Sequence, residues 1–168
     1  IFAMSLFLIA TISLSAGILF WKSYDDMVLQ QLEKRGEEIS SHIALASANY
    51  ILTEDVYNLY ELISQTASSS EDVRYIIVLD HKGRLLAHTF KDGLPEKLLW
   101  NVVGNTKAQT TVFNSNEGPI HDILSPIERG AIGYVRVGMT EQRMRSAIFK
   151  QVFIVLLAIF CFCLLGAF

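Results

Sequence analysis

The chain lacks every short motif that marks a common catalytic centre. Its 168 residues contain no GxSxG, no HExxH, no phosphate-binding loop and no kinase signature. Both cysteines, Cys161 and Cys163, lie in the last apolar run, so a CxxC zinc pair and a CxxCH haem-attachment motif are absent as well. We therefore expect no catalytic residue, metal or cofactor in this stretch, and whether the full-length protein is an enzyme stays open.

Charge is missing from both ends of the sequence. All 14 Lys+Arg and 17 Asp+Glu lie between Lys22 and Lys150. An α-helix rises about 1.5 Å per residue and needs about 20 apolar residues to cross a bilayer. We therefore predict transmembrane helices at residues 1–21 and 152–168, the second of them shorter than a full span. A cleaved signal peptide fits the first run poorly, because the run is too long and no small-residue cleavage motif follows Trp21.

The charged segment between these runs, residues 22–151, has the size of one domain. The net charge of -3 argues against nucleic acid as a partner. Two spans joined by one domain form a hairpin across the membrane, with lipid as a partner. We expect the domain to lie outside the cytoplasm.

The stretch Val73–Phe90 predicts a β-hairpin around which the domain is built. Two apolar runs, Tyr75–Leu79 and Leu85–Thr89, flank a turn that begins at Asp80, which we expect to hold the turn. Both faces of the first run are apolar, which predicts that both are covered. His88 is a polar group inside the second run, and it needs a partner or a ligand.

Two helices are predicted before the hairpin. In the first, apolar or small residues recur in alternating steps of three and four, which forms a heptad stripe. The second runs from Val56 to about Ser68, with Asp55 as N-cap. The heptad stripe supports either a parallel dimer of two copies or packing on the sheet of its own domain. The stripe comprises Leu29, Leu32, Gly36, Ile39, Ile43, Ala46 and Tyr50, and that of the second helix comprises Val56, Leu59, Tyr60, Ile63 and Ala67.

Beyond the hairpin the pattern predicts a short helix, three strands and a last helix. Pro126 should place the second of these strands at a sheet edge or at a bulge. The fold class is therefore α+β, an antiparallel sheet flanked by helices, with a long N-terminal helix, between two transmembrane helices. The expected elements are helix Glu96–Val103, strands Thr110–Phe113, Ile120–Ile127 and Ile132–Val137, and a helix capped by Thr140 that continues to Gln151.

This order of elements, with the hairpin YIIVLDHKGRLLAHT and the closing strands SPIERGAIGYVRVGM, resembles the extracytoplasmic Cache (PAS-like) sensor domains of bacterial receptors. The resemblance implies a homodimeric, multi-pass protein of the bacterial inner membrane with its sensor domain in the periplasm. It implies the sensory part of a signal-transduction receptor, most simply a two-component sensor histidine kinase. The sensor half of a chemoreceptor or nucleotide cyclase, or a membrane-anchored structural or interaction domain without a ligand, remains an alternative.

In that family a small ligand lies between the sheet and the segments after the hairpin. The element Ala87-His88-Thr89 is similar to one whose histidine holds a carboxylate in dicarboxylate and citrate sensors. Those sensors have an arginine where this sequence has Leu85, so the ligand class stays open. The candidate ligand-binding residues are His88, Tyr75, Trp100 and Arg136.

Each candidate also has a structural interpretation. His88 could be a core histidine with a satisfied hydrogen bond, Arg136 could face solvent from an alternating strand, and Tyr75 and Trp100 could pack in the core. His121 and Asp122 are adjacent in a strand and point to opposite faces, so they do not form a metal pair.

The last helix is the candidate for signal transmission. We expect Thr140, Arg143 and Arg145 to carry a ligand-dependent shift of the domain into the second span.

Overall fold

The computed structural model describes residues 2–90, 104–115, 118–142 and 154–155, with side chains from residue 27 onward. The described part is α+β, as the sequence predicts. The predicted helix Glu96–Val103 lies outside the described residues. The elements are α1 (Phe2–Leu52), α2 (Val56–Ser69), β1 (Val73–Asp80), β2 (Leu85–His88), β3 (Gln109–Ser115), β4 (Gly118–Ile127), the short 3-10 helix η2 (Glu128–Gly130) and β5 (Gly133–Thr140).

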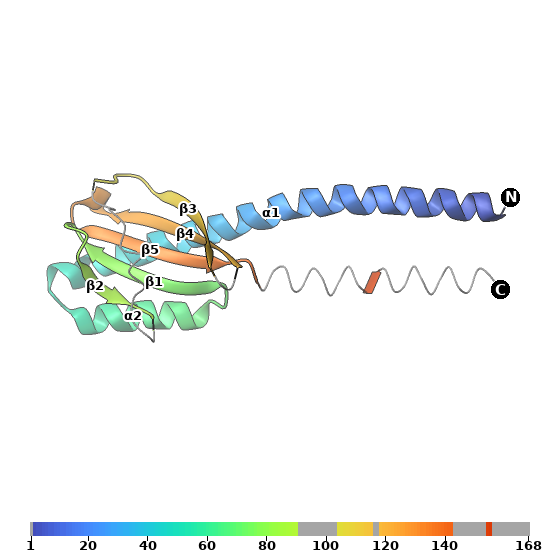
Figure 1. Ribbon diagram of the computed structural model, residues 1–168. Helices are drawn as coiled ribbons and strands as arrows, with labels where there is room; N and C mark the ends of the chain where they lie inside the picture. The colour runs from blue at the N-terminus through green and yellow to red at the C-terminus, as the bar shows by residue number, and fades with distance from the viewer. Residues whose placement is uncertain (1, 91–103, 116–117, 143–153, 156–168) are drawn as a thin grey trace. The chain divides into compact units, whose positions relative to one another are not determined.

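The strands form one antiparallel sheet in the order β2-β1-β5-β4-β3, seen side by side in Figure 1. The last strand of the chain, β5, therefore lies in the middle, between β1 and β4. The predicted hairpin is confirmed as the β1–β2 pair, in which Ile77 lies opposite His88. The edges of the sheet are β2 and β3.

Asp80 holds the hairpin turn, as predicted. Its carboxylate accepts hydrogen bonds from the backbone N–H groups of Lys82 (2.9 Å) and Arg84 (2.8 Å) and from Nε of Arg84 (2.6 Å). Burial alone would raise the pKa of the Asp80 carboxyl, but the hydrogen bonds and charge of Arg84, with the bond from Lys82, outweigh burial and lower it. The ionised carboxylate thus stabilises the turn.

Pro126 is predicted to mark an edge strand or a bulge, but β4 as a whole lies between β3 and β5 and its register with β5 shows no bulge at Pro126. The pairing with β3 ends where Gln109 lies opposite Leu124. Pro126 comes two residues later and is paired only with Tyr134 on β5. The proline, which has no N–H to donate, therefore lies where β4 has only one neighbouring strand.

The part of α1 from residue 33 onward packs on the sheet through small side chains. A Cβ atom on Gly36 would lie only 2.5 Å from Cδ1 of Ile123 on β4. Ser40 lies one turn further on, and its Oγ is 2.7 Å from Oγ of Ser125. From Gly36 onward the heptad stripe therefore packs against its own domain. Ser40 and Ser47, both buried, belong to this surface and were absent from the predicted stripe.

Helix α2 begins as predicted, because a carboxylate oxygen of Asp55 accepts the backbone N–H of Asn58 at 3.2 Å. Leu59 and Ile63 are buried. Val56 and Tyr60, predicted in the same buried stripe, are 52% and 53% exposed. The reason is that they line an open hollow beside the short edge strand β2.

The chain divides into two compact units, residues 1–32 and 33–168. Among the helices of the described residues, none combines the length and the hydropathy needed to cross a bilayer. The predicted span at residues 1–21 falls where side chains are not described, and that at 152–168 lies almost wholly outside the described residues. Both spans stay predictions.

The Asp80 turn gives a pH-dependent prediction. The folded-state pKa of Asp80 is depressed, so its stabilisation is present above the ordinary aspartate value of about 3.9 and is lost as pH falls through the folded pKa. Asp80→Asn should lower the free energy of unfolding at neutral pH by about 1–2 kcal/mol. Chemical unfolding should show this difference shrinking below about pH 4. The exposed control Glu61→Gln should cost little; equal pH dependence in both variants would contradict the assignment.

The close approach at Gly36 gives a packing prediction. Gly36→Leu forces a side chain against Ile123 and Met139, so it should lower the free energy of unfolding by about 1–3 kcal/mol. The matched control Ser41→Leu introduces the same side chain at an exposed position of the same helix and should change stability by less than about 0.5 kcal/mol. Equal effects in chemical unfolding would show that α1 does not pack closely at Gly36.

Candidate functional site

The sheet face opposite the helices has an apolar floor. Its residues alternate along β1, β4 and β5 with those that face the helices. Partly buried Phe90 and Phe113 pack against this floor, which consists of the buried side chains of Tyr75, Ile77, Leu79, Ile120, Leu124 and Tyr134.

A buried ion pair lies on the same face. Asp122 accepts hydrogen bonds from Nε of Arg136 at 2.9 Å and from Nη2 of the same guanidinium. Both residues are 5% exposed. A buried charge is tolerated only when it is paired, and here each group compensates the other. Arg136 is therefore not a solvent-facing residue, and that interpretation of the sequence is wrong.

Tyr75 reaches over Gly138 to contact this ion pair. Tyr75 on β1 and Asp122 on β4 are both opposite Gly138 of the strand between them. A Cβ atom at Gly138 would overlap the Tyr75 ring, so the ring occupies the space above the glycine. The Tyr75 hydroxyl then donates to Asp122 at 2.8 Å. Burial, the negative charge of Asp122 and this hydrogen bond raise the pKa of Tyr75 well above its usual value, which keeps the hydroxyl a donor.

His88 lies in one cross-strand row with Arg136. Ile77 is opposite His88 on one side and opposite Arg136 on the other, so the three side chains share a face. Two strand spacings separate His88 from Arg136, about 10 Å. Nδ1 of His88 is buried and has no hydrogen-bond partner among the described residues. Leaving such an atom unpaired costs about 1–3 kcal/mol, which a ligand could recover.

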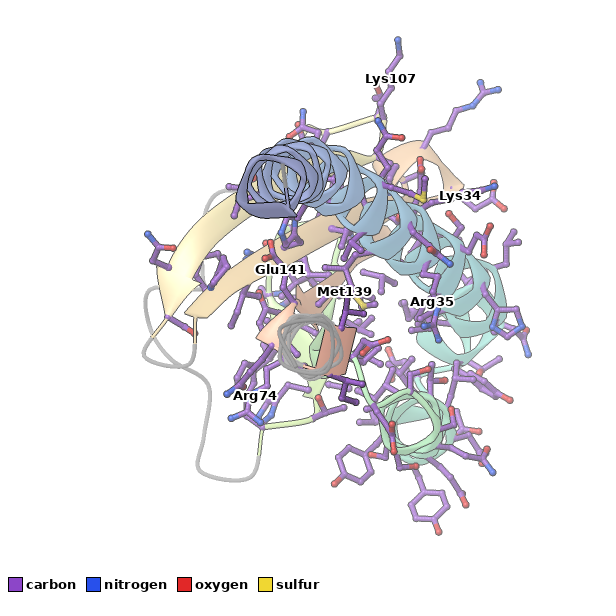
Figure 2. All side chains as sticks on the ribbon, turned by 90° about the vertical axis from the view of Figure 1, so that its right-hand side faces the viewer. Lys34, Arg35, Arg74, Lys107, Met139 and Glu141 are labelled. Atoms are coloured by element: carbon purple, nitrogen blue, oxygen red, sulfur yellow. The ribbon has the colours of Figure 1, made fainter. Side chains whose placement is uncertain are left out.

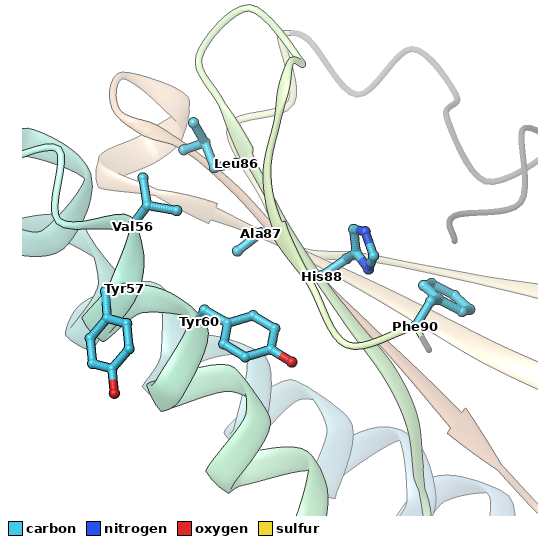
Figure 3. Close-up of a pocket in the computed structure, with 7 residues that line it drawn as sticks. All are labelled: Val56, Tyr57, Tyr60, Leu86, Ala87, His88 and Phe90. Carbon is cyan, nitrogen blue, oxygen red and sulfur yellow. The ribbon is translucent and has the colours of Figure 1, made fainter. Parts of the chain in front are cut away.

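A hollow of about 450 Å³ adjoins His88 at the edge of the sheet. Figure 3 shows the side chains of Tyr57 and Tyr60 on the α2 side of strand β2, with His88 and Phe90 on its other side. Of the lining residues, His88 and Phe90 therefore lie towards the sheet face that carries Tyr75 and Arg136. Its complete lining is Val56, Tyr57, Tyr60, Leu86, Ala87, His88 and Phe90.

The structure places three of the four candidate ligand residues, His88, Tyr75 and Arg136, on one face of the sheet. Trp100 lies outside the described residues. Sequence reasoning missed Asp122 as the partner of Tyr75 and Arg136. The available signal was an acidic residue inside the apolar run of β4.

The transmission candidates are described only in part. The hydroxyl of Thr140 accepts the backbone N–H of Gln142 at 3.3 Å, a contact suited to a helix N-cap. Arg143 and Arg145 lie outside the described residues. In the described part of the chain, no group of His, Cys, Asp and Glu side chains is suited to hold a metal ion.

A five-stranded antiparallel sheet in the order β2-β1-β5-β4-β3, with helices on one of its faces, is a PAS-like α+β fold. A family model for single Cache domain 3 matches residues 23–152. The chain therefore belongs to the single Cache domain 3 family. Cache domains are sensory domains of signal-transduction receptors and are typically extracytoplasmic. No curated protein matches the chain.

The ion pair gives a double-mutant prediction. Asp122→Ala leaves the buried Arg136 guanidinium without that carboxylate and should lower the free energy of unfolding by about 3–5 kcal/mol. Adding Arg136→Met removes the buried charge and should recover at least about 1 kcal/mol. Chemical unfolding of both single variants and the double variant measures the coupling; strictly additive costs would show that the two side chains do not interact.

Proposed function

We propose that this chain is the sensory and transmembrane part of a bacterial receptor in the inner membrane, with its sensor domain in the periplasm. A two-component histidine kinase is the proposed output, and a chemoreceptor or cyclase is the alternative. The family and the two uncharged ends support this proposal. The single observation that carries the proposed ligand-sensing role is the buried Nδ1 of His88. It is unpaired among the described residues, and His88 lies in one row with Arg136.

The charges of this face indicate the class of ligand. The guanidinium of Arg136 is compensated by Asp122, so it offers little free positive charge. A dicarboxylate or tricarboxylate would leave most of its charge unpaired on an apolar floor, which is costly. The proposed ligand is a small molecule with an apolar body and a single hydrogen-bonding or monoanionic group that binds His88.

Strand β5 connects this face with the proposed output. It carries Arg136 and ends at Thr140, before the segment that contains Arg143 and Arg145. A ligand with different affinities for two positions of β5 would shift the equilibrium between them. That shift would move the segment after Thr140 and the predicted second span.

The proposed receptor is a parallel homodimer. From Gly36 onward the heptad stripe packs on its own sheet, so in that part of α1 a different surface forms the proposed pair, whereas the stripe before Gly36 stays a candidate. Leu45 and Leu52, seven residues apart on one side of the helix, are 78% and 69% exposed. They are the proposed contact between copies.

The ligand proposal predicts a thermal shift that depends on His88. The full chain in detergent micelles is tested with monocarboxylates, dicarboxylates, amino acids and inorganic ions. A ligand at about 100-fold excess over its dissociation constant should add about 2.7 kcal/mol to the free energy of unfolding. His88→Ala should abolish the shift, whereas His81→Ala, an exposed histidine in the turn of the same hairpin, should retain it.

Two outcomes would contradict this prediction. A shift that survives His88→Ala would place the ligand elsewhere, and a panel without any shift would favour the interaction domain without a ligand. The coding sequence after Phe168 gives an independent check on the output, because a kinase module there supports the proposed receptor class.

A further inference from the structure

A buried histidine between two carboxylates lies on the helix-facing side of the sheet. His121 on β4 is 4% exposed, and its Nε2 is 2.6 Å from Oε1 of Glu141, whose side chain is 6% exposed. On the other side of the ring, Nδ1 is 3.4 Å from Oε1 of Glu33 on α1, whose side chain is 43% exposed. One imidazole thus connects α1, β4 and the residue that follows β5.

The two residues paired with His121 across the sheet carry no charge. His121 is opposite Val112 on β3 and opposite Met139 on β5, and neither side chain titrates. Its neighbour Asp122 points to the other face, where it binds Arg136. Figure 2 looks onto the end of the domain where β5 stops and labels Met139 and Glu141 there.

The other charged groups of this part of α1 are engaged elsewhere or exposed. Arg35 forms an ion pair with Asp72 at 2.9 Å. Lys34 and Glu37 are exposed, and Lys34 points outward in Figure 2. Glu33 and Glu141 are the carboxylates that contact the His121 ring directly.

The hydrogen-bonding roles depend on the charge of the ring. Imidazolium has two N–H donors and can donate to both carboxylates, whereas neutral imidazole has one donor and one lone pair. In the neutral form, one carboxylate must face a lone pair. The contact with Glu141 is the shorter one and is buried, whereas Glu33 is half exposed and can turn into water. Loss of the proton should therefore break the contact with Glu33 first.

We infer that His121 is an acid-dependent clasp that holds α1 to the sheet when its ring is protonated and releases Glu33 when it is neutral. The clasp lies where the chain leaves the sheet, because Glu141 directly follows the last residue of β5. Its closure requires no ligand, so it does not rest on the proposed ligand site. The pH would instead determine how firmly α1 is held to the sheet near Glu141, the residue that follows β5.

Hydrogen–deuterium exchange on the full chain in detergent micelles tests the clasp. Protection of the α1 amides from Glu33 to Ser40, corrected for intrinsic exchange, is compared at about pH 5.5 and about pH 8, on either side of the range in which histidine ordinarily titrates. In the wild type this protection should fall about tenfold at the higher pH, as expected for the loss of a hydrogen bond between charged groups.

The matched variant is Glu33→Gln, which changes a half-exposed side chain and leaves the buried pair intact. Its amide can donate to a neutral Nδ1, so protection of α1 should change less than about twofold with pH. The amides of α2 from Leu59 to Ile63 are the internal reference. A pH-independent wild type, an equal fall in Glu33→Gln, or an equal fall in α2 would each overturn the proposal.

The charge of the ring is measured directly as well. Nitrogen NMR of the histidine side chains, with His121 assigned by His121→Gln, should show both ring nitrogens protonated at the lower pH. A neutral ring there would also overturn the proposal. The thermal shift caused by a ligand at His88 should survive Glu33→Gln, so failure of the clasp and failure of the ligand site give different results.

Discussion

The carboxylate of Asp122 is the group on which the sheet face opposite the helices depends. It is buried, and it binds the guanidinium of Arg136 and the hydroxyl of Tyr75 at the same time. Breaking such a buried pair by removing one partner costs about 3–5 kcal/mol, a large part of the stability of an ordinary domain. The bonds of Asp122 to Arg136 and Tyr75 thus link β4 with β5 and with β1, the strands that form the floor of the candidate site. His88 acquires its place beside this floor because β2 pairs with β1.

On the helix-facing side of the sheet, small side chains determine how closely α1 packs. Gly36 and Ser40 let the backbone of α1 approach β4, where Ser40 meets Ser125. Large side chains at these positions would hold the helix away from the sheet. This close approach also brings Glu33 near His121. The packing of α1 and the proposed acid-dependent clasp thus have a common cause.

Local chemistry made part of this structure predictable. The Asp80 turn and the Asp55 cap follow from hydrogen bonds within a few residues of each aspartate, so the sequence alone predicts them. The environments of Arg136 and Pro126 depend on which strands become neighbours. The exposure of Val56 and Tyr60 depends in the same way on how little of α2 the short strand β2 covers. Predicting these outcomes would have required the order of the strands in the sheet, which the periodicity of apolar residues does not give.

The candidate site shows the same division. The sequence identified His88, Tyr75 and Arg136 as residues of interest, and the structure places them on one face. Sequence reasoning missed Asp122 because the pairing of Asp122 with Arg136 depends on the register between β4 and β5, which the sequence pattern does not reveal. The role of Gly138 was not predictable either. A glycine in a strand indicates that space is needed above it, but the sequence does not say that the Tyr75 ring occupies that space. Trp100, Arg143 and Arg145 stay predictions.

The central position of β5 has a consequence for how the domain folds during synthesis. The β1–β2 and β3–β4 hairpins are local in sequence and can form while later residues are still within the ribosome. They cannot join into one sheet until residues 133–140 emerge and insert between them. Completion of the domain therefore waits for the segment that immediately precedes the predicted second span, and a chain truncated before residue 133 would hold two hairpins without the strand that unites them.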